Sequence, residues 1–175
     1  TDTARAESEA GNKEGICYRV NVVGAENIAN SCRDHNIFMI HVSTDFVFDG
    51  TKTDPYVEND PRSPASWYGT TKALAEEAVE KSGVKYAIAR LSYPYRANFD
   101  QKPDIIKKIR EALSTHTLTP RFSDTLITPT FVDDIARGFA RLATLQPEGI
   151  YHLVGTGSIS PYDLAREVAV AYDLD

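Results

Sequence analysis

Three neighbouring pieces of sequence decide the fold, namely VSTDFVFDG (42–50), PYVEND (55–60) and PRSPASWYGTTK (61–72). They begin as the end of a strand, continue as a proline-rich polar loop and enter a helix. Tyr68 and Lys72 are four residues apart in that helix, so phenol and ammonium lie on one face. A cation beside a phenol lowers its pKa by about 1–3 units from about 10. The spacing predicts that Tyr68 exchanges a proton near neutral pH, with Thr44 as a second hydroxyl.

Hydrophobic periodicity on either side of this stretch alternates between helix and strand patterns. Strands that alternate with helices predict a parallel sheet with right-handed crossovers, so the expected class is α/β. The predicted helices cover residues 16–34, 66–81, 103–114, 130–145 and 163–172, and the predicted strands cover 37–43, 84–93 and 150–155.

Local signals add detail to these elements. Thr130 and Asp133 have the spacing of a capping box, and Ser160 followed by Pro161 marks another helix start. Gly24 interrupts a helix at a cost of about 1 kcal/mol relative to alanine, so we expect a neighbour to pack closely against it. Residues 1–15 are polar without apolar periodicity, which predicts a mobile segment.

Composition excludes several classes of protein. The net charge of −6 argues against a nucleic-acid binder, which normally has a basic face. No apolar run approaches the roughly 20 residues that span a bilayer, so no membrane partner is expected. The two cysteines, Cys17 and Cys32, are too few for a disulfide scaffold and lie too far apart on one helix to pair. They indicate a reducing compartment, and we expect a cytoplasmic protein.

The order of motifs resembles the extended short-chain dehydrogenase/reductase family, and within it the dTDP-4-dehydrorhamnose reductase branch. YxxxK alone is a weak signal, but its combination with STDFVFDG upstream is specific. The resemblance runs from about Tyr18 to the end of the chain. It is carried by VSTDFVFDG, PYVEND, YGTTK, ARLSYPY (89–95), ITPTFVDDIARG (127–138) and GIYHLVGTGSISPYDLARE (149–167).

The resemblance implies roles for individual residues. Tyr68 matches the catalytic tyrosine that gives a proton to a ketone oxygen, and Lys72 matches the lysine that binds the cofactor ribose. Thr44 matches the hydroxyl residue of the strand end. The implied cofactor is NADP or NAD, because no side chain can supply a hydride. The resemblance assigns Thr44, Tyr68 and Lys72 to catalysis, Val42, Ser43, Tyr68 and Lys72 to the cofactor, and Thr44, Asp45, Phe46 and Tyr93 to the substrate.

One feature of the family is missing from the sequence. The glycine-rich strand–turn–helix that seats a pyrophosphate has no match, because GTGS (155–158) lies too late in the chain. We therefore expect an incomplete Rossmann-like parallel sheet with helices on both faces, without the main cofactor-binding half. Residues 16–93 would form the second half of the core, and 94–175 a small α/β substrate-binding part with returning core elements. Open strand edges would favour a homodimer.

Three functions remain open on these residues. The first is NAD(P)H-dependent reduction of a nucleotide-linked 4-keto-6-deoxy sugar. The second is a non-catalytic binding homologue, because regulatory subunits of methionine adenosyltransferase resemble the same branch. The third is a nucleotide-sugar epimerase, whose strand-end loop usually differs from STDFVFDG.

Structural roles compete with functional ones at several positions. Asp45 and Asp49 are equally typical of turns, which their side chains stabilise through the backbone. His41 lies in an apolar strand, which predicts a satisfied core histidine, and Trp67 is expected in the core. Arg90 and Arg96 have the chemistry to bind a phosphate, although surface ion pairs are commoner. No histidine has metal-ligand spacing, so no metal site is expected; the four histidines are His35, His41, His116 and His152.

Overall fold

The computed structural model describes residues 3–97, 99 and 101–174, and its chain forms two compact units. The first unit contains Thr1–Arg90 and Phe139–His152, and the second contains Leu91–Gly138 and Leu153–Asp175. The elements in chain order are α1 (Thr3–Glu7), α2 (Ile16–Tyr18), η1 (Arg19–Val23), α3 (Gly24–Asp34), β1 (Met39–Thr44), η2 (Asp45–Val47), α4 (Trp67–Lys81), β2 (Tyr86–Leu91), β3 (Pro94–Tyr95), α5 (Ile105–Ser114), β4 (Thr130–Phe131), α6 (Val132–Leu145), β5 (Gly149–His152) and α7 (Pro161–Tyr172).

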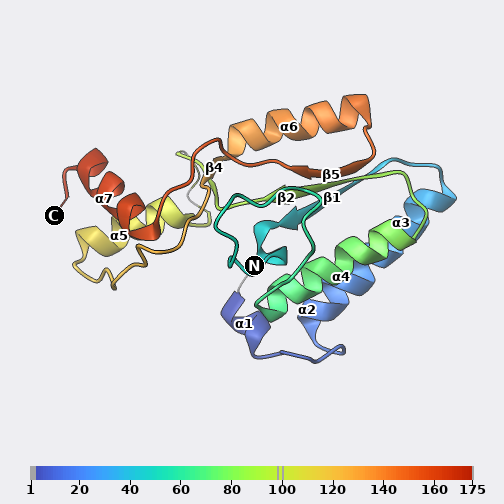
Figure 1. The fold of residues 1–175 in the computed structure, drawn as a ribbon, viewed down its shortest axis with the longest axis horizontal. Coiled ribbons are helices and arrows are strands. Elements are labelled where there is room, and N and C mark those ends of the chain that lie inside the picture. Colours follow the sequence, from blue (N-terminus) through green and yellow to red (C-terminus); the bar gives the residue numbers. More distant parts are fainter. Residues whose placement is uncertain (1–2, 98, 100, 175) are drawn as a thin grey trace. The chain divides into compact units, whose positions relative to one another are not determined.

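The first unit is built on a three-stranded sheet in the order β1-β2-β5 (Figure 1). β2 and β5 run parallel, with Ala87 opposite Gly149 and Arg90 opposite His152. Helices α3 and α4 lie side by side on one face, and residues 139–145 of α6 lie on the other. This is the predicted α/β class, a small parallel sheet covered on both sides.

Small and branched side chains form the core between this sheet and its two helices. Ala29 and Ala75 let α3 and α4 approach closely, and Val79 and Ile88 are fully buried beside them. Because β2 is covered on both faces, its middle residues are all buried and follow no alternation.

The predicted helix over residues 16–34 forms, but it contains one turn of π-helix, η1, between α2 and α3. The close packing expected at Gly24 is wrong. A Cβ there would meet only the Arg19 carbonyl oxygen, at an ordinary 3.6 Å. Gly24 is the first residue after the π-helical turn η1, so it lies where the helix returns to ordinary α-helical hydrogen bonding.

Helix α1 corrects the prediction of a mobile segment over residues 1–15. Residues 3–7 form a short helix with Ala6 buried, and Glu7 reaches the start of α4. Residues 1 and 2 lie outside the described part. Periodicity could not reveal α1, since it is only five residues long.

The second unit combines a two-stranded parallel sheet, β3-β4, with helices α5 and α7. Ile109, Ile127 and Leu164 belong to its buried core. Ser160 caps α7 as predicted, because its hydroxyl accepts a hydrogen bond from the Asp163 amide at 3.0 Å.

The capping box predicted at Thr130 is wrong. Thr130 pairs with Pro94 as part of strand β4 and is buried. Its hydroxyl donates to the Thr128 carbonyl and accepts from the Gly155 amide. Pairing between strands takes this residue out of the helix, and α6 begins two residues later.

Candidate active site

Helix α4 presents Tyr68 and Lys72 one turn apart, as the spacing predicts. The helix begins after Ser66, whose hydroxyl accepts a hydrogen bond from the Gly69 amide at 3.0 Å. Both side chains are half-buried on this helix. The cap fixes the first turn of α4, so the backbone of Tyr68 starts from a defined position.

Lys72 connects this helix to the end of strand β1. Its ammonium donates a hydrogen bond of 2.6 Å to the carbonyl oxygen of Val42. Burial lowers the pKa of Lys72 below its ordinary value, and the nearby Glu76 carboxylate partly offsets this effect. The cation therefore lies beside the strand residues that lead to Thr44.

Thr44 is buried and ends strand β1, but its hydroxyl has local partners. It donates to the Asp45 carboxylate at 3.0 Å and accepts from the Phe46 amide at 3.3 Å, so it caps η2. Asp45 is half-buried, and its carboxylate accepts this hydrogen bond from the residue before it. This contact supports the turn-forming role of its side chain. A ligand at Thr44 would have to share its hydroxyl with this turn.

The rings of Phe46 and Tyr68 meet edge to face with centroids 5.8 Å apart. This contact is close because Gly69 has no side chain. A Cβ at Gly69 would overlap the carbonyl oxygen of Phe46 and lie 3.1 Å from the Pro64 Cβ. The glycine between the predicted catalytic residues is what lets η2 reach α4.

Val42 and Ser43 were both predicted to contact a cofactor, and the structure gives them different surroundings. The Val42 side chain is 47% exposed. Ser43 is buried, and its hydroxyl donates to the carboxylate of Glu76. A ligand can meet Ser43 only through its backbone while this bond is kept.

Tyr93 belongs to the second unit, where it packs against the core around Ile109 and Ile127. Its φ of 39° lies in the left-handed region, which is rare for a residue with a large side chain. Strain of this kind costs about 1–3 kcal/mol and is common at ligand sites. The substrate contact predicted for Tyr93 stays a prediction.

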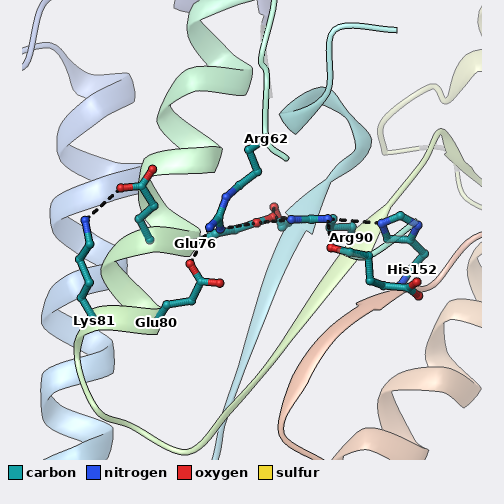
Figure 2. A network of polar contacts seen from close by, with 9 residues as sticks. Arg62, Glu76, Glu80, Lys81, Arg90 and His152 are labelled. Atoms are coloured by element: carbon teal, nitrogen blue, oxygen red, sulfur yellow. Dashed lines mark hydrogen bonds and ion pairs between the residues drawn. The ribbon is translucent and has the colours of Figure 1, made fainter. Parts of the chain in front are cut away.

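The sequence reasoning missed a buried charge cluster centred on Glu76 (Figure 2). Glu76 is fully buried and accepts hydrogen bonds from Arg90 at 2.7 and 3.0 Å and from Arg62 at 3.0 Å. Burial by itself raises the pKa of Glu76. The hydrogen bonds from Arg90 and Ser43 and the charges of Arg90 and Arg62 outweigh burial, so the pKa lies below its ordinary value.

Arg90 therefore has a different role from the two that the sequence suggested. It is 2% exposed, forms a two-point ion pair with Glu76 and lies over the Phe48 ring with its Cζ 5.0 Å from the centroid. It is neither a free phosphate ligand nor a surface ion pair. Arg96 does form a surface pair, at 3.0 Å from Asp133.

Two further contacts support α4 and carried no sequence signal. The Glu7 carboxylate accepts hydrogen bonds from the Trp67 amide at 2.7 Å and the Tyr68 amide at 3.4 Å. On the inner face of the helix, the Thr71 hydroxyl accepts from Asn21 of η1 at 2.9 Å. The first turn of α4 is thus held from both sides by residues distant in sequence.

His41 was expected to be a satisfied core histidine and Trp67 a core residue, and the structure corrects both, since within the described part of the chain the His41 ring has an unpaired nitrogen and Trp67 is only half-buried. His41 is 8% exposed, and burial lowers its pKa to about 4, with the charge of Lys72 acting in the same direction. Among the residues that the structure describes, its Nε2 has no hydrogen-bond partner, and neither does the buried Nε1 of the half-buried Trp67, which stacks on Tyr18. His41 is a neutral core residue with one unpaired nitrogen.

Among the described residues, no three His, Cys, Asp or Glu side chains gather in a way that could hold a metal ion. Cys17 and Cys32 are both free thiols. None of the helices in this part of the chain is long and apolar enough to cross a membrane.

Comparison with known proteins gives a consistent result. The family model described as "RmlD substrate binding domain" matches residues 1–175. A dTDP-4-keto-6-deoxy-D-glucose reductase of Streptomyces niveus is 34% identical over 168 residues, which are 94% of this chain and 56% of that protein. A dTDP-4-dehydrorhamnose reductase of Sinorhizobium fredii is 33% identical over 89% of this chain and 54% of that protein. The chain thus spans about half the length of these relatives.

Solved structures agree with the sequence comparison. The crystal structure of dTDP-4-dehydrorhamnose reductase from Bacillus anthracis, in complex with NADP, matches with a TM-score of 0.88 and 26% identity. The match covers all of this chain and 60% of that chain. The predicted Rossmann-like character of the fold is therefore confirmed.

Proposed function

The chain belongs to the RmlD substrate binding domain family. We propose that it is part of an NAD(P)H-dependent reductase and carries the residues that donate the proton to the substrate. The substrate is a nucleotide-linked 4-keto-6-deoxy sugar, as the names of the Streptomyces and Sinorhizobium relatives suggest. One observation carries the proposal. Helix α4 places the Tyr68 phenol one turn from a half-buried lysine ammonium, beside a strand that ends in the Thr44 hydroxyl.

The residues of the first unit fit a nicotinamide nucleotide at this point. The Lys72 ammonium has three N–H groups and donates one of them to the Val42 carbonyl, which leaves donors for ribose hydroxyls. The exposed Val42 side chain offers an apolar surface beside it. When bound, the cofactor supplies the hydride for the carbonyl carbon. The proposed cofactor is NADP or NAD.

Tyr68 acts as the general acid in this proposal. Reduction of a ketone develops negative charge on its oxygen, and the phenol gives that oxygen a proton. The Lys72 ammonium stabilises the phenolate that remains, because opposite charges within reach favour the charged form. Thr44 would orient the oxygen through its hydroxyl, with Asp45 and Phe46 at the sugar.

The test is turnover of a dTDP-4-keto-6-deoxy sugar with NADPH by the whole protein and its Tyr68→Phe variant. Loss of a general acid lowers the rate by about 10²–10⁴-fold. Tyr172→Phe, at the end of α7, is the matched control and should keep wild-type turnover. Wild-type turnover by Tyr68→Phe would contradict the assignment of the acid. Cofactor binding without any turnover would favour a binding homologue.

Two further properties belong to the same proposal. We place the protein in the cytoplasm, since both cysteines are free and the nucleotide-sugar substrate is an intracellular type of metabolite. We also propose a homodimer, because a strand at the edge of a small sheet presents unpaired backbone groups. Ultracentrifugation of residues 1–175, which carry this edge, tests the dimer.

A further inference from the structure

The side chains of α4 that face the end of β1 recur every four residues. They are Tyr68, Lys72 and Glu76, so they follow one face of the helix. The first two belong to the proposed reaction. The third is fully buried and is not explained by proton transfer or by cofactor binding.

Two of these residues hold consecutive positions of the strand. Lys72 donates to the backbone carbonyl of Val42, and Glu76 accepts from the side-chain hydroxyl of Ser43. One contact holds the backbone of the strand at Val42 and the other holds the side chain of Ser43, so together they fix both the position and the rotation of the strand end. The next residue is Thr44.

Glu76 is itself held firmly. Arg90 of β2 binds both carboxylate oxygens, and Arg62 adds a hydrogen bond to one of them. Arg90 in turn donates to the Glu58 carbonyl at 3.2 Å and lies over the Phe48 ring. Figure 2 shows the Arg62 and Arg90 side chains converging on Glu76 between α4 and the strands. A carboxylate with four hydrogen bonds has little freedom to move.

We propose that Glu76 is a positioning residue for the reductase reaction: its buried carboxylate locks the end of β1 against α4 and thereby keeps Thr44 and Lys72 in a fixed relation to Tyr68. The inference rests on the proposed function for its consequence in catalysis, but its geometry is independent of that function. A buried ion pair is often no more stabilising than apolar side chains of similar volume. We infer that the buried Glu76–Arg90 pair instead serves to hold Thr44 and Lys72 in place.

The charge of Glu76 acts on Lys72 as well. Among the described residues, two ionisable groups are electrostatically coupled to the Lys72 ammonium: Glu76 on its own helix, which raises its pKa, and His41 on β1, whose own pKa Lys72 lowers; the Tyr68 phenol lies one turn away on the same helix. Glu76 is the only one of these two that is negative at neutral pH. Its carboxylate therefore helps to keep Lys72 charged in a partly buried place.

The experiment separates charge from position in the chain itself. Glu76→Gln removes the charge but keeps the size and one oxygen acceptor, and NMR of carbon-13-labelled lysine then reports the titration of Lys72. We expect its pKa to fall by about 1 unit, as loss of a nearby opposite charge requires. Glu80→Gln is the matched control, because Glu80 belongs to the same helix and cluster but pairs with Arg62 and does not shift the pKa of Lys72. It should leave Lys72 unchanged.

Ser43→Ala tests position without disturbing the buried pair, and it decides the matter even if Glu76→Gln fails to fold. We expect the amides of Thr44 and Phe46 to exchange about tenfold faster, with exchange in β2 unchanged. In the whole protein kcat should fall about tenfold with KM nearly constant. Unchanged amide exchange in Ser43→Ala would overturn the proposal, as would an unchanged Lys72 titration in folded Glu76→Gln. Failure of the turnover test alone would remove the reductase function and leave the positioning role intact.

Discussion

Glu76 and Asp49 lie in two contrasting regions of the first unit and have similar hydrogen bonding. Glu76 sits under helix α4 with no exposed surface and accepts from Ser43, Arg62 and Arg90. Asp49 sits in the exposed loop after η2, where one oxygen accepts from the Thr51 amide, the Thr51 hydroxyl and the Tyr56 hydroxyl. Both carboxyl groups have a lowered pKa.

The causes of the two shifts differ. For Asp49 the Thr51 backbone amide has the largest effect, followed by the Tyr56 hydroxyl, and water surrounds the group. For Glu76 burial acts in the opposite direction and is overcome only by two guanidinium groups and a hydroxyl. Removing a partner of Asp49 lets water replace it, whereas removing a partner of Glu76 leaves a buried charge uncompensated.

The largest effect should follow from breaking the buried pair. Arg90→Ala leaves Glu76 without its two-point partner inside the core, and we expect a loss of about 3–5 kcal/mol in the free energy of unfolding. Urea unfolding followed by circular dichroism measures it. Lys81→Ala removes an exposed ion pair with Glu77 on the same helix and should cost under about 1 kcal/mol. Similar losses in the two variants would contradict the contrast between buried and exposed charge.

Gly69 joins the two regions, since it is where the beginning of the exposed loop touches the buried face of α4. A Cβ in Gly69→Ala overlaps the backbone oxygen of Phe46, which cannot rotate away. We expect a destabilisation of about 1–3 kcal/mol from this overpacking. Gly157→Ala is the control, because nothing lies within 4 Å of the added carbon and its φ is ordinary. Equal urea midpoints for both variants would show that α4 and η2 can separate freely.

His41 extends the comparison to pH. Its pKa of about 4 in the folded chain lies below the ordinary 6.5, so only the unfolded chain binds a proton between these values. The contribution of His41 to the free energy of unfolding is therefore largest above pH 6.5. It falls as the pH drops, by about 2 kcal/mol between pH 7 and pH 5. This range lies above the ordinary titration of carboxyl groups.

The measurement for His41 is urea unfolding at pH 7 and pH 5. His41→Leu removes the titrating group and its unpaired nitrogen, so the part of the loss that comes from His41 should disappear. A smaller loss should remain from His152, because burial lowers its pKa too. His116→Asn changes an exposed histidine at a left-handed backbone position that asparagine tolerates, and it should keep the wild-type loss. If His41→Leu loses as much stability as wild type, another group accounts for the pH dependence.

The smallest effect belongs to the exposed carboxylate. Asp49→Asn keeps the shape of the loop but weakens the three hydrogen bonds to one oxygen. We expect faster exchange of the Thr51 amide without a measurable change in the urea midpoint, since water can take over these contacts. A clear drop in the midpoint would mean that the loop stabilises the whole unit.

The sequence was a good guide where the signal is local. The four-residue spacing of Tyr68 and Lys72 gave the face of α4, and Ser160 with Pro161 gave the start of α7. Local signals failed where a distant partner intervened. Strand pairing took Thr130 out of its capping box, and contact with α4 ordered the region around Glu7.

The candidate site likewise contains residues that the sequence could predict and one that it could not. Thr44, Tyr68 and Lys72 could be named from residue types and spacing, because one strand end and one helix turn are local structures. Glu76 could not, since a glutamate in a helix is usually on the solvated face. Its partners come from a strand, a loop and a second strand, at residues 43, 62 and 90.

Sequence alone therefore determined the α/β class, the family resemblance and the phenol–ammonium face of α4. Tertiary structure decided which polar residues are buried, because burial depends on what packs from the other side and not on the residue itself. Ser43 turned inward, Arg90 became a core ion pair and Gly69 became a contact point only when α4 lay across the end of β1. Charge and size are properties of a residue, whereas the free energy of burying them belongs to the fold.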